Sequence, residues 1–351
     1  MDIVRKAIEL IDTGESFSIG TVVHAQGSTP QKSGCKALLT RDGRQWGTLG
    51  GGMVEAEGLE RMRQSIGAGK AELFEFRLDN DYSRAAGPIC GGVMRILDDP
   101  GASRNAEHYR AAVGAADRRE RGLLVTTLGG DDPGNVIWLR EDQLNGACPL
   151  PNGEALARQL REESPGAVSL DPTTEVFVEP IIAPPRLLVV GGGHVGQVVV
   201  QQAAAIGFDV TLADDRPEFS RPELFPEGTR CLSGDLRKLV AEFPQDRDTY
   251  IVLVSKGHRP DAEALEACIH GNAGYIGMIG SRRKIRFLKK HFIETALCTE
   301  AEWDRIAAPI GLDIGAVTVP EIGVSIAAQL IAARRLGRLE GRAMRLAESK
   351  I

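Results

Sequence analysis

The chain has 351 residues, of which 41 are glycine and 42% are apolar, and its net charge is −6. Glycine is well above its average share of about 7%, but glycine and proline together stay below the ~25–30% of low-complexity chains, which excludes disorder and collagen-like order. The acidic balance disfavours nucleic acid as the main partner. The length favours two domains.

No apolar run approaches the ~20 residues that cross a membrane, and the first residues have mixed charge, unlike a signal peptide. We therefore expect a cytoplasmic protein without a membrane span. Its six cysteines are expected to be reduced, and most of them to be small buried apolar residues.

The first half of the chain mixes helical and strand patterns without regular alternation. Helices are expected at 1–13, 53–66 and 106–119, and strands at 17–25, 36–49, 71–78, 93–99, 122–130 and 135–140. The last two strands are expected to form a hairpin. The segment 169–186 contains four prolines, which suits a linker or an edge strand.

From residue 186 onward, apolar strands alternate with helices. Strands are expected at 186–193, 208–215, 248–257 and 274–281, and helices at 194–207, 261–271 and 320–346. Strands that are apolar throughout indicate a parallel sheet buried on both faces. The fold class is therefore α/β, with an N-terminal mixed α+β domain at 1–180 and a C-terminal Rossmann-like domain at 181–351.

A dinucleotide-binding fingerprint lies at the first turn of this second domain. Gly191, Gly193 and Gly196 spell GxGxxG between a predicted strand and a predicted helix, which is the context that this motif requires. The three glycines allow the tight turn, the approach of a pyrophosphate and close helix packing. His194 lies inside the loop and is a further candidate for ligand binding.

The end of the next strand carries two acids. Asp214 is expected to accept hydrogen bonds from a ribose, and with Asp215 it disfavours a 2′-phosphate, although Arg216 could offset this. The alternative is a Rossmann-like domain that keeps the turn and binds no nucleotide.

Several ordered segments resemble a known family. They are GSTPQKSGCKALLTRDGRQWGTLGGGMVEAE and CGGVMRIL in the first half, then GGGHVGQ, ADDRPEF, VSKGHRPDAEAL, YIGMIGSRRK and APIGLDIGAVTVPEIGVSIAAQLIA. The set resembles the xanthine dehydrogenase accessory protein family of the XdhC/CoxI type, over roughly 5–98 and 186–335.

The resemblance implies a cytoplasmic maturation factor for a molybdenum hydroxylase of the xanthine dehydrogenase type. Such a factor binds molybdenum cofactor, either molybdopterin or its dinucleotide, and protects it while a cysteine desulfurase supplies its terminal sulfur. It then delivers the cofactor. The resemblance also implies a mixed N-terminal domain, a C-terminal Rossmann domain and a homodimer.

Two glycine-rich segments of the first half could meet an anionic cofactor. The turn Gly50, Gly51 and Gly52 precedes a predicted helix, whose N-terminus attracts anions, although Glu55 would repel an anion that came too close. The alternative is a tight strand-to-helix connection. Relatives often carry Cys where this chain has Met53, which we expect to fill the core.

The second segment contains Cys90, Gly91 and Gly92. The Cys90 thiolate could contact the metal or a transferable sulfur, and burial as a packing residue is the alternative.

Cations follow two strands of the second domain. Lys256 and His258 lie where ligands of parallel sheets bind, beyond the carboxyl ends of strands; His258 could instead be a capping or core residue. Ser281 is expected to cap a helix, after which Arg282 and Lys284 could clamp a phosphate. A solvated basic face is the alternative.

Three functions compete. We expect a cofactor chaperone without turnover of its own. The first alternative is an NAD(P)-dependent oxidoreductase that uses the C-terminal domain, and the second is a nucleotide-sensing regulator. We find no ligand cluster for a metal-dependent hydrolase in the sequence.

Overall fold

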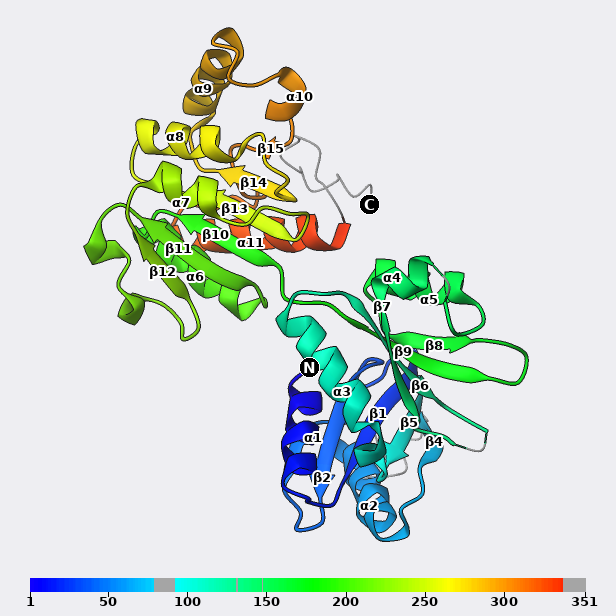
Figure 1. Ribbon diagram of the computed structural model, residues 1–351. Helices are drawn as coiled ribbons and strands as arrows, with labels where there is room; N and C mark the ends of the chain where they lie inside the picture. Colours follow the sequence, from blue (N-terminus) through cyan, green and yellow to red (C-terminus); the bar gives the residue numbers. More distant parts are fainter. Residues whose placement is uncertain (79–91, 131, 147, 337–351) are drawn as a thin grey trace, which may run out of the picture. The chain divides into compact units, whose positions relative to one another are not determined.

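The computed structural model describes residues 1–78, 92–130, 132–146 and 148–336. The chain divides into two compact units, Met1–Ala183 and Pro184–Ile351 (Figure 1). The division falls within the proline-rich sequence Ala-Pro-Pro-Arg. None of the helices in the described part of the chain is long and apolar enough to cross a membrane.

The first unit opens with an antiparallel five-stranded sheet in the order β3-β2-β1-β5-β4. Its elements are α1 (Asp2–Asp12), β1 (Phe17–Gln26), β2 (Lys36–Thr40), β3 (Gln45–Gly47), α2 (Gly52–Ala68), β4 (Glu72–Leu78) and β5 (Gly92–Asp99). The predicted strand 36–49 is therefore wrong as one strand, because residues 41–44 turn the chain so that β3 pairs back on β2.

Helices cover both faces of this sheet, so its central strand is buried from Phe17 to Val23. Alternation along β2 separates the two cores: Leu38 packs with α1 and the helix α3 (Ala106–Asp117), whereas its neighbour Leu39 packs with α2. The two-residue period of a strand explains this division.

A second antiparallel sheet, in the order β7-β6-β9-β8, completes the first unit. Its strands are β6 (Gly122–Thr127), β7 (Val136–Arg140), β8 (Gly166–Ser169) and β9 (Glu175–Ile181), and η1 (Ala102–Asn105), α4 (Glu141–Asn145) and α5 (Gly153–Glu162) are its remaining helices. The hairpin predicted at 122–140 is confirmed as β6 and β7.

The edge-strand interpretation of 169–186 is wrong, because β9 lies between β6 and β8. The linker interpretation holds for the end of the segment, where the two units divide between Ala183 and Pro184. The prolines suggested an edge strand, but a proline is also compatible with an inner strand where its nitrogen faces no hydrogen-bond partner. Pro180 lies beyond Val178, the last β9 residue that has a partner in β8. Its missing N–H therefore removes no hydrogen bond from that ladder.

The second unit is a six-stranded parallel sheet in the order β12-β11-β10-β13-β14-β15, which is the Rossmann order. Its strands are β10 (Arg186–Val190), β11 (Asp209–Asp214), β12 (Arg230–Ser233), β13 (Thr249–Leu253), β14 (Tyr275–Met278) and β15 (Ile306–Ala307). The predicted fold class, α/β with a mixed first domain and a Rossmann-like second domain, is thereby confirmed.

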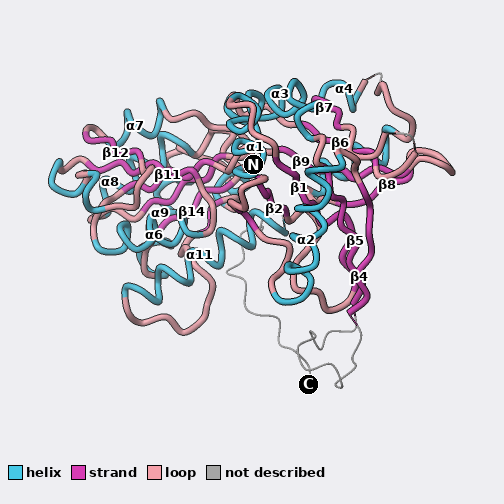
Figure 2. The backbone as a smooth tube through the Cα atoms, turned by 90° about the horizontal axis from the view of Figure 1, so that it is seen from below, coloured by secondary structure: helices cyan, strands magenta, loops and turns pink. Residues whose placement is uncertain are grey.

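Helices cover both faces of the parallel sheet. They are α6 (His194–Ala205), α7 (Leu236–Glu242), α8 (His258–Cys268), α9 (Arg282–Glu294), α10 (Glu300–Trp303) and α11 (Val319–Leu336), with short turns η2 (Pro217–Phe219) and η3 (Pro222–Leu224). Figure 2 shows the strands between α7 on one side and α6 and α11 on the other. Leu187 packs toward α6 and α11, whereas Leu188 packs toward α7, α8 and α9.

The predicted long terminal helix is confirmed up to Leu336, and its remainder lies outside the described residues. Ile326 and Leu330 are fully buried against the sheet, as the apolar spacing indicated. The cysteines follow their prediction less well. Among the five in the described ranges all are free, but only Cys268 and Cys298 are buried.

Gly196 allows α6 to pack against the turn that precedes it. A Cβ at Gly196 would lie 1.8 Å from the carbonyl oxygen of Gly191, whereas a Cβ at Gly193 would meet nothing within 4 Å.

We expect Gly196→Ala to lower the free energy of unfolding by about 3 kcal/mol, because the clash is with backbone. Gly193→Ala is the matched control and should cost no more than about 1 kcal/mol, because it meets no clash and only places alanine at the N-cap of α6. Chemical denaturation of both variants measures this, and equal stabilities would contradict the packing role.

Candidate functional site

The glycine loop between β10 and α6 has an open position at Gly193. Gly191 has a φ of 113°, and a Cβ there would lie 2.7 Å from backbone atoms of Val254 and Ser255. Gly193 is the N-cap of α6, and the space beside its Cα is free of other atoms within 4 Å. An anion could therefore approach the backbone at Gly193 and at His194, the first residue of α6.

Asp214 ends β11 beside this loop, and its carboxylate is only 1% exposed. It accepts hydrogen bonds from the Gly192 N–H at 2.6 Å, and from the backbone N–H, Nε and Nη2 of Arg216 at 2.9 Å each. Burial acts to raise the pKa of Asp214, but these hydrogen bonds outweigh it and hold the pKa below its usual value. The carboxylate for which the sequence predicted a ribose contact is therefore already hydrogen-bonded to Gly192 and Arg216 of the same chain.

The two residues after Asp214 differ in their surroundings. The side chain of Asp215 is 55% exposed, with its Oδ1 3.7 Å from the Arg216 Nε. The Arg216 guanidinium lies over the ring of Phe219, 4.0 Å from its centroid. The Phe219 carbonyl oxygen packs against Gly192, and a Cβ on Gly192 would lie 2.1 Å from it. The segment from Arg216 to Phe219 therefore covers one flank of the glycine loop.

The loop after β13 is held by the buried carboxylate of Asp261, to which the sequence analysis gave no role. Asp261 is fully buried, and its Oδ1 accepts the N–H and the hydroxyl of Ser255, at 3.1 and 2.5 Å. Its Oδ2 accepts the Lys284 ammonium at 2.6 Å. Lys256 itself is exposed on this loop, and His258 is the first residue of α8.

Lys284 joins the loops that follow two neighbouring strands. Besides Asp261, its ammonium donates to the carbonyl oxygens of Gly257 at 3.3 Å and of Ile279 at 3.5 Å. Its side chain is only 12% exposed. The predicted phosphate clamp therefore has its ammonium directed inward, and Arg282 is the exposed cation of that pair. The N-cap prediction for Ser281 is confirmed, because its hydroxyl accepts the Lys284 N–H at 3.2 Å.

In the first unit, Glu55 occupies the N-terminus that the glycine turn exposes. Gly50, Gly51 and Gly52 have φ values of 131°, 75° and 59°. The Glu55 carboxylate accepts the Gly51 N–H at 2.6 Å. Burial acts to raise the pKa of Glu55, but hydrogen bonds from Thr48 and its neighbours outweigh it and lower the pKa. An external anion at Gly51 would have to displace this carboxylate.

Met53 does not fill the core, and that prediction is wrong: its side chain is 45% exposed. It lies in the first turn of α2, where the core-facing position is taken by its neighbour Val54, which is 1% exposed. The turn therefore presents a thioether to solvent.

The glycine motifs of the first unit meet at one end of its first sheet. A Cβ at Gly50 would lie 2.9 Å from the Pro30 side chain, and one at Gly92 would lie 2.5 Å from the carbonyl oxygen of Ser28. The loop 27–34 thus contacts both the turn at 50–52 and the start of β5. Cys90 and Gly91 directly precede this point in sequence and lie outside the described residues.

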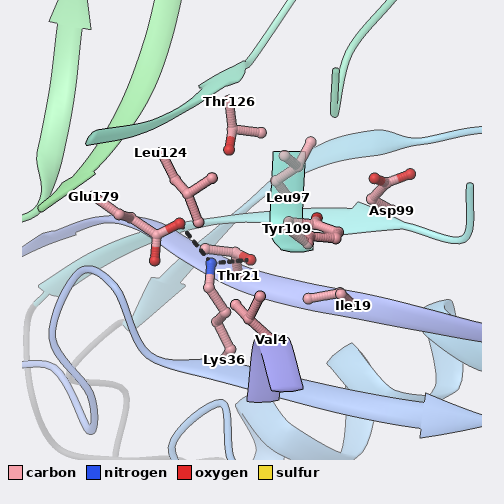
Figure 3. Close-up of a pocket in the computed structure, with 10 residues that line it drawn as sticks. All are labelled: Val4, Ile19, Thr21, Lys36, Leu97, Asp99, Tyr109, Leu124, Thr126 and Glu179. Atoms are coloured by element: carbon pink, nitrogen blue, oxygen red, sulfur yellow. Dashed lines mark hydrogen bonds and ion pairs between the residues drawn. The ribbon is translucent and has the colours of Figure 1, made fainter. Parts of the chain in front are cut away.

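An enclosed cavity in the first unit is too small for a cofactor (Figure 3). Its volume of about 20 Å³ has room for about one water molecule. The Lys36 ammonium points to Glu179 at 2.8 Å and to the Thr21 hydroxyl at 3.0 Å. Burial raises the pKa of Asp99 in the same lining. This cluster is a polar junction between the two sheets rather than a ligand site.

The described ranges contain no group of three or more His, Cys, Asp or Glu side chains placed to hold a metal ion. This finding does not cover the segment that contains Cys90.

Segments of both units match models of known protein families. Residues 187–330 match the XdhC Rossmann domain, and residues 10–77 match the XdhC and CoxI family. The chain belongs to the XdhC and CoxI family. The resemblance that the sequence motifs indicated is thereby confirmed, and the Rossmann match covers the glycine loop, Asp261 and Lys284 of this XdhC-type protein.

Three relatives match nearly the whole XdhC-type chain. The protein YqeB of Escherichia coli K12 is 26% identical over 94% of the chain, which spans 46% of YqeB. A probable xanthine dehydrogenase component of Bacillus subtilis is 25% identical over 93% of the chain and 96% of the relative. The molybdenum cofactor insertion chaperone PaoD of E. coli K12 is 22% identical over 95% of the chain and 88% of PaoD.

A crystal structure described as a xanthine dehydrogenase from Bacillus halodurans has the same fold. Its TM-score is 0.74 at 22% identity, over 95% of this chain and 96% of that one. The likeness therefore supports the arrangement of elements along the XdhC-type chain.

We expect Lys284→Met to destabilise the second unit by about 3 kcal/mol, because it leaves the buried Asp261 without its cation. The matched control on the same helix is Lys290→Met, since Lys290 is 72% exposed and 3.7 Å from Glu294. The control should unfold at the same urea concentration as wild type. Urea denaturation followed by circular dichroism measures both, and equal midpoints for the two variants would refute the role of Lys284 as an internal tie.

Proposed function

We propose that this protein is an accessory factor that binds molybdenum cofactor, protects it during sulfuration and delivers it to a molybdenum hydroxylase of the xanthine dehydrogenase type. The observation that carries the proposal is the match of 95% of the chain to a molybdenum cofactor insertion chaperone. The match to a probable xanthine dehydrogenase component over 93% of the chain supports the type of enzyme that is served.

The cargo is an anion that carries a phosphate or pyrophosphate, a dithiolene and metal oxo groups. Backbone N–H groups with little steric bulk beside them are suited to its phosphate end. Gly193 and His194 offer such a position at the N-terminus of α6, with the open space beside Gly193. We assign the phosphate end of the cofactor to this loop, with Gly191 and Gly196 shaping it.

Cations beyond the strand ends would complete this contact. The exposed side chains of Lys256 and Arg282 follow β13 and β14, at the edge where ligands of parallel sheets bind. Arg216 lies beside the glycine loop and keeps a part of its guanidinium in solvent, since its side chain is 31% exposed. His258 and Ser281 belong to the same edge. Lys284 serves this site by holding the loops in place.

The first unit, taken by itself, offers a candidate ligand contact of its own. The turn at 50–52, the loop 27–34 and Gly92 lie together there. Cys90 and Gly91 adjoin Gly92 in sequence, and we assign the Cys90 thiolate to the metal or its transferable sulfur. A cysteine desulfurase is the proposed source of that sulfur, and the proposed carrier is a homodimer.

The arrangement at Asp214 favours this function over an NAD(P)-dependent oxidoreductase. An acid that reads a ribose needs a free oxygen for the hydroxyl groups. Both oxygens of Asp214 already accept two hydrogen bonds each from Gly192 and Arg216. A nicotinamide dinucleotide would have to displace Arg216 from this buried pair.

Anaerobic purification from a host that makes molybdenum cofactor tests the proposal. We expect near-stoichiometric molybdenum by elemental analysis and a fluorescent pterin after oxidation of the bound material. Protein from a host deficient in the cofactor is the control and should carry neither. A preparation that lacks both but binds NAD and produces NADH with a substrate would overturn the carrier function.

The role of Cys90 is tested separately. We expect Cys90→Ala to weaken retention of molybdenum at least about tenfold, because it removes the thiolate, while circular dichroism and the unfolding midpoint stay unchanged. Cys148→Ala is the matched control, since Cys148 is a free, half-buried thiol that packs against the core beneath α5. Equal retention by both variants would assign Cys90 to packing.

A further inference from the structure

The outward side of α9 combines arginine with an exposed aromatic ring. The helix buries Ile285, Leu288 and Phe292 against the sheet. At 100° per residue, Arg283, Arg286 and Phe287 lie on the opposite side. The Phe287 side chain is 74% exposed, which is exceptional for so large an apolar group. We call Arg283, Arg286 and Phe287 the α9 basic face.

The arginines of this face have no acidic neighbour in the described part of the chain, unlike the lysines of the same helix. Lys284 pairs with Asp261, Lys289 with Glu300 and Asp304, and Lys290 with Glu294. Arg283 and Arg286 are exposed, and no carboxylate among the described residues lies within ion-pair distance of either. A local excess of positive charge therefore remains on a chain whose net charge is −6.

A groove runs beside the α9 basic face, between α8 and α9. Its volume is about 570 Å³, and Ala262, Phe287 and Leu288 contribute its apolar wall. Arg283 and His291 lie at its α9 side, and Ser281 and Lys284 line the end next to the start of α9. Arg259 lies at its α8 side, is 89% exposed and pairs with Glu263 at 2.8 Å. An apolar wall beside Arg283, which has no carboxylate partner among the described residues, suits a segment that carries both an apolar side chain and carboxylates.

We infer that the α9 basic face docks an acidic segment of a partner protein, with an apolar side chain of that segment in the groove beside Phe287. Arginine is among the residue types that most often dominate interface energies, and phenylalanine is enriched in interface cores. Arginines that lack an internal carboxylate can bind carboxylates of a partner through paired hydrogen bonds. The inference rests on the proposed function, under which the partner is the molybdenum hydroxylase that receives the cofactor.

The face differs from the proposed cofactor contact in what it exposes. The cofactor contact uses backbone N–H groups and cations at the ends of strands. The α9 basic face is formed by side chains along little more than one helical turn, and it includes an apolar ring that is 74% exposed. Loss of this face should therefore impair delivery and leave cofactor retention unchanged.

The test measures binding of the full-length protein to the hydroxylase of its own organism, produced without cofactor in a deficient host. In biolayer interferometry we expect Arg283→Glu and Phe287→Ser each to raise the Kd at least about tenfold. Arg230→Glu is the matched control, because Arg230 is an exposed arginine on the edge strand β12. It should change the Kd by less than about twofold. Raising NaCl from about 50 to about 300 mM should weaken binding of the wild type more than binding of Arg283→Glu.

The outcomes separate this inference from the proposed function. Wild-type binding to the hydroxylase that neither variant weakens overturns the docking face and leaves the carrier function intact. Loss of bound molybdenum and pterin in the variants also overturns it, because the face would then belong to the cofactor site. Tighter binding of wild type to a single-stranded oligonucleotide than to the hydroxylase would assign the face to nucleic acid. Wild-type protein without cofactor and without affinity for the hydroxylase refutes the proposed function itself.

Discussion

The ion pair between Lys284 and the fully buried Asp261 organises the carboxyl end of the parallel sheet. A buried carboxylate is costly unless it is paired and hydrogen-bonded, and Asp261 meets this demand with Lys284 and Ser255. Lys284 in turn reaches carbonyl oxygens after β13 and after β14. The positions of the loop that carries Lys256 and of the start of α9 therefore depend on one pair of charges.

Internal carboxylates also shape the two glycine turns. Asp214 accepts the N–H of Gly192 in the second unit, and Glu55 accepts that of Gly51 in the first. Each acid takes up one of the backbone donors that a glycine-rich turn offers, and a fixed negative charge repels an anion placed directly against it. In the glycine turn of the second unit, the backbone N–H groups left for a ligand are therefore those of Gly193 and His194. These residues follow Gly192, whose N–H binds Asp214.

The periodicity of the sequence was sufficient for most of the second unit. Strands such as the one that contains residues 187–190 are apolar in continuous runs and alternate with helices, and this pattern is typical of a sheet with both faces covered. The first unit was harder because its strands are antiparallel, so short turns rather than helices join some of them. Residues 36–49 carry one strand-like pattern, yet the turn at 41–44 divides them into β2 and β3. Pro180 suggested an edge, but the neighbouring strand β8 ends before it.

By itself the sequence determined the family, the Rossmann unit and the places where backbone can approach a ligand, because glycine spacing and apolar periodicity are local properties. The tertiary structure alone decided which charged side chains remain available to a ligand. Lys284 and Arg283 are neighbours in one basic run, but only Lys284 lies within reach of a buried acid from another helix. Asp214 is likewise occupied because Gly192, 22 residues away along the chain, lies beside it. Electrostatic pairing depends on the distance between charges in space, and the spacing of charges along the chain does not reveal that distance.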